Sequence, residues 1–243
     1  MDGTSVSLEK EDIMIKISNA TKKYGIGNAT VFALNNVNLN IKEKEICVIL
    51  GASGSGKSTL LNIIGGLDTL DNGFVEIENK NISNLKSEEL TLYRRHKTGF
   101  VFQFYNLIQD LSVEENIRVA SNISQNPLNV EEVLTILNIN SLKNRFPNEL
   151  SGGQQQKVSI ARALIKNPSI LLCDELTGAL DSKSSKEVLK AIETINKKYG
   201  TTVLIITHNE SILNMGDRVI KIKDGKIIEN IEKDRIPVEI IEI

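Results

Sequence analysis

The 243-residue sequence contains no tryptophan, and aromatic residues make up only 4% of it. Proteins that hold single-stranded nucleic acid by stacking its bases need more aromatic surface than this. Charge points the same way, because 29 Lys and Arg residues are balanced by 31 Asp and Glu residues, for a formal net charge of -2. No excess of positive charge is left for a phosphate backbone. We therefore expect no nucleic acid partner.

Long apolar runs and cysteine pairs are also scarce. The longest apolar runs are far shorter than the roughly 20 residues that span a bilayer; they cover 46–50, 170–173 and 203–206. The polar, acidic segment 1–12 is unlike a signal or transit peptide. Cys47 and Cys173 lie inside apolar runs and are predicted to be buried thiols in a reducing compartment, a disulfide being the less favoured alternative. If the chain acts at a membrane, we expect it to associate peripherally rather than to cross the bilayer.

Short β-branched runs alternate with helix-forming stretches, which predicts an α/β fold. The expected strands are 13–18, 37–41, 46–50, 73–77, 99–102, 170–173 and 202–206, with a hairpin of 218–223 and 226–231. The expected helices are 57–65, 87–96 (capped by Ser87), 113–119, 130–138, 151–166 and 184–198, with a short one from 210. The segment 236–243 is expected to be a strand or a loose tail. Because 103–150 contains no strand-like run, it is a candidate helical lobe.

The strongest motif fits G-x-x-x-x-G-K-[ST] and lies between a predicted buried strand and a predicted helix. Glycines let backbone N–H groups surround phosphates, and the helix N-terminus adds partial positive charge. We expect Lys57 to reach the β- and γ-phosphates and the Ser58 hydroxyl to bind Mg²⁺. A glycine-rich turn without a ligand is the weaker alternative. The predicted phosphate-binding residues are Gly51, Ala52, Ser53, Gly54, Ser55, Gly56, Lys57, Ser58 and Thr59.

A second motif is the apolar strand that ends in Asp174 and Glu175. Strand ends in parallel sheets face the crevice where ligands bind. Asp174 is placed to hold Mg²⁺, directly or through water, and Glu175 to polarise an attacking water as general base. The alternative, that the acidic pair only caps a helix, is weaker because a phosphate loop occurs in the same chain.

A third motif, Leu-Ser-Gly-Gly-Gln at 150–154, opens a predicted helix. Ser151 is expected to cap this helix, and the two glycines expose N–H groups at its N-terminus, which makes a second anion site. On its own the pattern is often only a helix start.

In chain order, the motifs at 51–59, 150–154 and 170–175 resemble Walker A, the LSGGQ signature and Walker B of the nucleotide-binding subunit of an ATP-binding cassette (ABC) transporter. The resemblance implies a P-loop NTPase (RecA-like) core with an N-terminal antiparallel β part and an inserted helical lobe. It places one ABC ATPase domain at 1–243, with the core at 13–102 and 167–231, the lobe and signature at 103–166 and a tail at 232–243.

Four minor motifs of the family are matched as well. Tyr24 matches the aromatic residue that stacks on adenine, Gln103 the Q-loop glutamine, Asp181 the D-loop aspartate and His208 the switch histidine. Taken alone, Tyr24 is equally an exposed turn aromatic and His208 a structural histidine. The resemblance implies catalytic roles for Glu175, His208 and Gln103, and magnesium ligands Ser58, Gln103 and Asp174.

The resemblance also implies partners. Two copies are expected to pair head to tail, so that ATP and Mg²⁺ lie between the Walker motifs of one copy and the signature of the other. An integral-membrane permease is the second expected partner, with the chain peripheral at the cytoplasmic face of the membrane. The residues expected to contact nucleotide across the dimer are Ser151, Gly152, Gly153, Gln154 and Asp181.

Within the family, the segments 51–68, 98–108 and 177–183 resemble ATPases of lipoprotein-release, macrolide and antimicrobial-peptide exporters. The expected function is hydrolysis of ATP to power a permease that exports peptide, lipoprotein or drug-like substrates. An ATP-driven regulator of a membrane partner in cell division is the alternative, since it would share every ATPase motif. Leu176 departs from the proline usual in the family and is expected to loosen the aim of the carboxylates before it.

Three aromatic residues cluster near the presumed junction of the lobe with the core. Two interpretations stay open for them: core packing, or an apolar notch for a helix of a membrane partner. They are Phe102, Phe104 and Tyr105.

Overall fold

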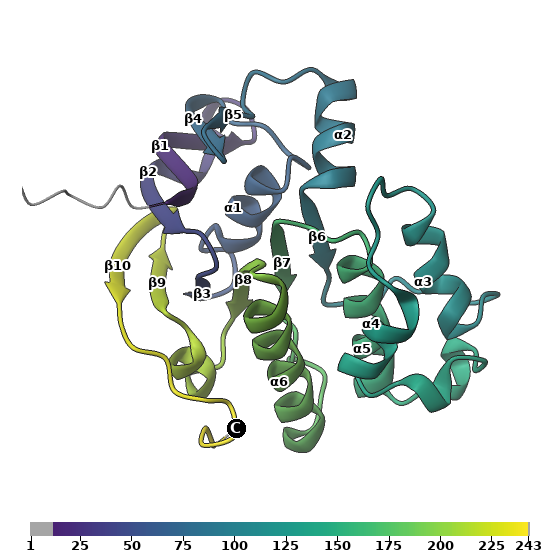
Figure 1. Cartoon of the computed structure of the whole chain (residues 1–243). Coiled ribbons are helices and arrows are strands. Elements are labelled where there is room, and N and C mark those ends of the chain that lie inside the picture. Colours follow the sequence, from purple (N-terminus) through teal and green to yellow (C-terminus); the bar gives the residue numbers. More distant parts are fainter. Residues whose placement is uncertain (1–11, 243) are drawn as a thin grey trace, which may run out of the picture.

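The computed structural model describes residues 12–242 as an α/β fold with two sheets, as the sequence predicts (Figure 1). A four-stranded antiparallel sheet has the order β2-β1-β4-β5, and a six-stranded sheet has the order β10-β9-β3-β8-β7-β6. In the second sheet β9, β3, β8, β7 and β6 run parallel, and β10 pairs antiparallel with β9. The strands are β1 Ile13–Tyr24, β2 Val31–Lys42, β3 Ile46–Leu50, β4 Asn72–Ile77, β5 Lys80–Asn81, β6 Thr98–Val101, β7 Ile170–Asp174, β8 Thr202–Thr207, β9 Arg218–Lys223 and β10 Lys226–Glu232.

The helices lie around the six-stranded sheet (Figure 1). α1 lies between the two sheets, α6 covers the opposite face of the parallel sheet, and α3, α4 and α5 gather beyond the β6 edge. They are α1 Lys57–Ile64, α2 Ser87–His96, α3 Val113–Ser121, α4 Val130–Ile136, α5 Gly152–Leu164 and α6 Ser182–Tyr199. Four 3-10 turns are η1 Gly27–Ala29, η2 Asn140–Leu142, η3 Pro147–Glu149 and η4 Glu210–Met215. None of the helices described is long and apolar enough to cross a membrane.

The central parallel strands are apolar along most of their length because both of their faces are covered. Every residue of β3 and of β8 is buried. On one face, Ile49 and Leu172 pack with Leu60 of α1 and with the antiparallel sheet. On the other face, Val48 and Leu171 belong to a core shared with α3, α4, α5 and α6. Two apolar layers therefore hold the sheet rigid, and its strand ends are fixed points for a site.

Most predicted elements occur within a few residues of their expected places, and the hairpin of β9 and β10 is confirmed. One expected cap is wrong. Ser87 is the first residue of α2 itself, and the cap position belongs to Lys86. The backbone N–H of Lys86 donates to the Glu89 carboxylate at 2.9 Å, so the first-turn acid takes over the capping role. The short strand β5 was not predicted, because two polar residues carry no periodicity.

The segment 236–242 is neither of the two expected alternatives. It contains no strand in its described part, yet Val238 and Ile241 are buried in the core that α6 helps to form. The Lys186 ammonium donates to the Ile241 carbonyl at 3.1 Å, and Lys190 pairs with Glu239 at 2.8 Å. The expectations for 1–11 and for Ile243 lie outside the described residues.

Candidate active site

Four parallel strands end at one edge of the central sheet, and the loops after them enclose a cavity of about 340 Å³. The loops follow β3, β6, β7 and β8, which are far apart in sequence. The cavity brings together most of the residues expected to bind phosphate and magnesium or to hydrolyse ATP: Gly51, Ser53, Gly54, Lys57, Ser58, Gln103, Asp174, Glu175 and His208.

The loop after β3 turns sharply into α1 at Gly56. This residue has a φ of 106°, and a Cβ there would lie 2.1 Å from the Ala33 carbonyl oxygen, so only glycine fits. Lys57 follows as the first residue of α1, and its side chain is largely buried. Its ammonium donates to the carbonyls of Gly51 and Ala52, each at 2.8 Å. The charge is therefore held directly over the loop.

The back of this loop rests on the hairpin turn between β9 and β10. The Gly225 N–H donates to the Ser55 carbonyl at 3.0 Å, and the Asn35 N–H of β2 donates to the Gly225 carbonyl at 2.8 Å. Gly225 has a φ of 73°, and a Cβ there would lie 2.9 Å from the Phe32 carbonyl. One glycine thus joins the loop to strands of both sheets, which limits how far the loop can open.

Asp174, at the end of β7, faces Ser58 on α1. Burial raises the pKa of the Asp174 carboxyl and the neighbouring Glu175 adds to this, while the Ser58 hydroxyl and the Lys57 charge act the other way. A serine hydroxyl beside one carboxylate, with the Gln103 amide on the same cavity, is an oxygen donor set that suits Mg²⁺. Mg²⁺ usually takes only one or two carboxylates from a protein and completes its shell with phosphates and water. The residues present fit the ion.

Glu175 and His208 meet across the cavity. The Nδ1 of His208 lies 2.9 Å from Oε2 of Glu175, whose side chain is largely buried, while that of His208 is 69% exposed. Glu175 has a φ of 53°, a left-handed conformation that is strained for a residue with a side chain. Its N–H donates to the Ile206 carbonyl of β8 at 3.0 Å. The next residue, Leu176, is buried in the core, so packing rather than a proline ring holds the peptide after Glu175. Its expected loosening effect stays a prediction.

The signature and the D-loop lie outside this cavity. Ser151 caps α5 as predicted: its hydroxyl accepts the Gln154 N–H at 3.4 Å, and the Gln154 amide oxygen accepts the Ser151 N–H at 2.9 Å. Asp181 caps α6 by accepting the N–H and the hydroxyl of Ser184. None of the residues expected to act across a dimer lines the cavity of its own chain.

Tyr24 ends β1 and also stands apart from the lining of the cavity. Its ring is about half exposed, and its hydroxyl donates to Asp68 at 2.6 Å. Asp68 follows α1, the helix that begins at the phosphate loop. Sequence reasoning did not single out Asp68, because an acid after a helix carries no motif of its own.

The three aromatics near the lobe do not share one environment. Phe102 stacks on Phe100 with ring centroids 5.4 Å apart, and Tyr105 packs against the core. Phe104 is instead 77% exposed. Core packing therefore accounts for Tyr105, whereas Phe102 is half-buried against Phe100 and Phe104 offers the largest apolar surface of the three.

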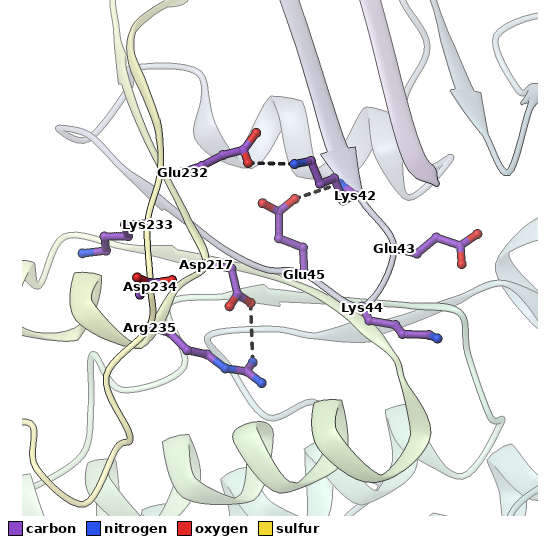
Figure 2. Close-up of a pocket in the computed structure, with 9 residues that line it drawn as sticks. All are labelled: Lys42, Glu43, Lys44, Glu45, Asp217, Glu232, Lys233, Asp234 and Arg235. Atoms are coloured by element: carbon purple, nitrogen blue, oxygen red, sulfur yellow. Dashed lines mark hydrogen bonds and ion pairs between the residues drawn. The ribbon is translucent and has the colours of Figure 1, made fainter. Parts of the chain in front are cut away.

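A larger cavity of about 540 Å³ lies near the opposite ends of the sheet strands (Figure 2). Its walls are almost entirely charged, but the buried groups are paired within the fold. Glu45 accepts the Lys42 N–H at 2.7 Å and the Arg218 guanidinium at 2.9 Å, and Asp217 accepts the Ile46 N–H at 2.8 Å. The residues lining this charged cleft are Lys42, Glu43, Lys44, Glu45, Asp217, Glu232, Lys233, Asp234 and Arg235.

Comparison with known proteins shows the family of the chain. A family model described as ABC transporter matches residues 34–178, which include the phosphate loop and the Asp174–Glu175 pair. The chain is also 47% identical, over 88% of its length, to the uncharacterized ABC transporter ATP-binding protein MJ0796 of Methanocaldococcus jannaschii, and it covers 95% of that protein. The chain belongs to the ABC transporter family. It is an ATP-binding and ATP-hydrolysing component.

Two further relatives of this ABC ATPase are exporters by name. It is 40% identical to the bacitracin export ATP-binding protein BceA of Halalkalibacterium halodurans, over 90% of this chain and 89% of BceA. It is 41% identical to the macrolide export ATP-binding/permease protein MacB of Mannheimia succiniciproducens, but spans only 35% of that longer protein. A solved structure of MJ0796, described as a dimeric post-hydrolysis state bound to ADP and Pi, matches with a TM-score of 0.82 and 43% identity over 90% of this chain and 98% of that one.

Proposed function

We propose that this ABC ATPase hydrolyses ATP at the cavity between the phosphate loop and His208. The observation that carries the proposal is the convergence of four strand ends on one cavity that holds Lys57, Asp174 and Glu175 together. Lys57 and the loop N–H groups bind the phosphates. Glu175 takes a proton from the attacking water, and His208, in contact with Glu175, reaches the γ-phosphate.

Mg²⁺ is proposed to be held by Ser58, Asp174 and Gln103. When bound, the ion neutralises charge that develops on the β- and γ-phosphates. The contact of Ser58 with Asp174 supports this assignment, since it sets two oxygen donors side by side before any ion arrives.

The complete site is proposed to need two chains. Ser151 and Gly152 begin α5 with a free helix N-terminus, yet they line no part of their own cavity. A second copy in head-to-tail arrangement would place this N-terminus against the γ-phosphate. The dimeric, ADP- and Pi-bound state of MJ0796 supports that arrangement.

The membrane partner is proposed to be a permease that exports peptides or drug-like molecules, with this chain peripheral at the cytoplasmic face. The names of BceA and MacB favour an exporter over the alternative of a cell-division regulator. Phe104, exposed one residue after Gln103, gives the permease an apolar contact next to a ligand of the nucleotide site.

Substitution of Gly152 by Asp tests the two-chain site. We expect Gly152→Asp to leave ATP binding to one chain nearly intact and to abolish hydrolysis, because a carboxylate would face the γ-phosphate held by the other chain. Gly152→Asn is the matched control, since it adds the same bulk without the charge and should lose less activity. Full hydrolysis by Gly152→Asp would exclude the proposed arrangement.

Mixing two inactive variants sharpens this test. In a mixed head-to-tail dimer of a Gly152→Asp chain with a Lys57→Ala chain, one site carries both defects and the other carries neither. We expect part of the hydrolysis to return on mixing, measured as phosphate release against the two separate variants. Restored activity would be hard to explain if each chain held a complete site.

A further inference from the structure

The end of β1 that carries Tyr24 is fastened by the loop that follows α1. The two carboxylate oxygens of Asp68 accept hydrogen bonds from different residues. Oδ1 accepts one from the Lys22 ammonium at 2.6 Å, and Oδ2 accepts one from the Tyr24 hydroxyl at 2.6 Å. Lys22 also donates to the Thr69 carbonyl at 2.8 Å, and Asp71 accepts the Lys23 N–H at 2.6 Å. The last three residues of β1 are thus each bonded to the same short loop.

The bonds leave one face of the Tyr24 ring for a ligand. The Lys22 ammonium lies 5.2 Å from the ring centroid, which occupies one face with a cation–π contact. Lys22 is nearly buried, so this cation is fixed in place, whereas the ring itself is about half exposed. With its hydroxyl tied and one face covered, the ring has a single orientation. A planar base that stacks on it loses less conformational entropy than it would against a free ring.

The charges of this cluster support each other. Burial alone would raise the pKa of Asp68, but hydrogen bonds from Lys22 and Tyr24 hold it below its ordinary value. Burial alone would lower the pKa of Lys22, and the bond to Asp68 raises it instead. The pKa of the Tyr24 hydroxyl is raised by burial and by its bond to Asp68. All three groups therefore keep the protonation states that the bonds require.

We propose that Asp68 is a positioning residue for nucleotide recognition, because it holds the Tyr24 ring in the orientation on which the adenine of ATP stacks. Helix α1 sets the distance between this ring and the phosphate loop. The N–H groups of Leu67 and Asp68 both donate to the Asn62 carbonyl of α1, so the loop follows that helix rigidly. A continuous set of covalent and hydrogen-bonded links therefore runs from the phosphate loop through α1 and Asp68 to Tyr24. The proposal rests on the assignment of Tyr24 to adenine stacking.

Comparison of ATP with inorganic tripolyphosphate separates this role from a general structural one. Asp68→Ala should weaken ATP binding by about 2- to 10-fold, the size of one lost hydrogen bond, and leave tripolyphosphate binding unchanged. Tyr24→Phe removes only the hydroxyl, keeps the Lys22–Asp68 pair and should weaken ATP binding similarly. Both affinities are measured by calorimetric titration in the presence of Mg²⁺.

Glu76→Ala is the matched control. Glu76 pairs with Lys16 on the same strand β1 at 3.5 Å, and Lys16 also lies over an aromatic ring, that of Phe74. This trio also combines a carboxylate, a lysine and an aromatic ring but has no link to Tyr24, so the control should bind both ligands as the parent does.

The remaining outcomes are decided by Tyr24→Ala. If that variant binds ATP as tightly as the parent, adenine stacking on Tyr24 is wrong. If Tyr24→Ala weakens ATP binding but Asp68→Ala and Tyr24→Phe do not, stacking stands and the positioning role of Asp68 is overturned. An equal loss of ATP and tripolyphosphate binding in Asp68→Ala would also overturn it. Asp68→Ala should have no further effect on ATP binding in the Tyr24→Ala background, whereas a full additional loss there would contradict the proposal.

Discussion

The cavity at the phosphate loop and the charged cleft are both polar hollows beside the same parallel sheet, but their charges are arranged differently. At the cleft, the buried Glu45 pairs with Arg218 at 2.9 Å, and Arg218 also donates to Asn230. The Lys42 ammonium likewise pairs with Glu232 across the cleft (Figure 2). In the active-site cavity, the Lys57 ammonium donates to two backbone carbonyls. Burial, and after it the charge of the adjacent Glu175, raises the pKa of Asp174.

This difference supports the proposal that the smaller cavity, rather than the larger one, is the ATP site. Charges that are paired within the fold have few hydrogen-bonding positions free for a ligand. Loss of one partner of such a buried pair destabilises the fold, because the other charge stays buried and unpaired. Acids held next to each other are costly unless a cation joins them, and the nearby lysine and helix N-terminus attract a phosphate. The smaller cavity therefore gains more from a ligand.

The largest effect is expected for Glu175→Gln. The amide cannot take a proton from water, while the phosphate and magnesium contacts stay, so turnover should fall by about 100- to 10,000-fold with ATP binding retained. Steady-state phosphate release and equilibrium titration of ATP measure the two quantities. A dimer should also accumulate with ATP in size-exclusion chromatography. Turnover at the parent rate would remove Glu175 from catalysis.

In the charged cleft, Glu45→Ala should cost about 3 kcal/mol of folding free energy, because Arg218 loses a buried carboxylate but keeps Glu232. Nucleotide affinity should not change. Glu43→Ala is the matched control: it lines the same cleft but is exposed, and should shift stability by less than about 0.5 kcal/mol. Urea unfolding midpoints measure both. Weakened ATP binding at unchanged stability in Glu45→Ala would give the cleft a role in nucleotide binding.

Lys57→Ala should reduce ATP affinity by one to two decades, since a charge-assisted contact with phosphate is worth about 1.5–3 kcal/mol. Titration with a fluorescent ATP analogue measures this. Lys226→Ala, an exposed lysine on β10, controls for the loss of one positive charge and should bind as the parent does. Equal affinity for all three proteins would mean that the loop does not bind phosphate as described.

The smallest effect concerns pH. Hydrogen bonds from Lys42 and then from Arg218 hold the pKa of Glu232 below its ordinary value of 4.5. The charged form therefore adds stability that is complete above pH 4.5 and is lost as the pH falls through the lowered pKa. Because this side chain is half exposed, Glu232→Gln should cost under about 1 kcal/mol at neutral pH. The gap in stability between parent and variant should close as the pH falls below 4.5 and through the lowered pKa. A gap that widens on acidification would contradict this assignment.

The sequence predicted those features of the fold that depend on residues close together in the chain. The continuous apolar run of β3 and the G-x-x-x-x-G-K-[ST] spacing determine a strand, a turn and a helix start within 20 residues, and the structure has them where expected. The helix cap at Ser151 is of the same kind. Ser87 shows the limit, because a serine before a helix resembles a cap even when the next turn supplies a better acceptor from Glu89.

Contacts between distant segments were not predictable in this way. The bond of Tyr24 to Asp68 joins residues 44 apart, and Gly225 reaches Ser55 across most of the chain. Neither position carries a periodicity or spacing that marks the pairing. Burial of Val238 and Ile241 was missed for the same reason: an alternating apolar pattern suits a strand as well as an irregular segment that packs on a helix.

The two cysteines have a kinetic consequence. Cys47 on β3 belongs to the core that faces the antiparallel sheet, and Cys173 on β7 belongs to the core that faces α5 and α6. Burial raises the pKa of both free thiols, so neither forms the thiolate that alkylating reagents attack. Labelling in the native protein requires transient opening of the core. The labelling rates of Cys47 and Cys173 therefore report separately on opening at the two faces of the sheet. Slower labelling of Cys47 in the presence of ATP would show that ATP reduces opening of the face that holds α1. The measurement uses the native cysteines and needs no engineered one.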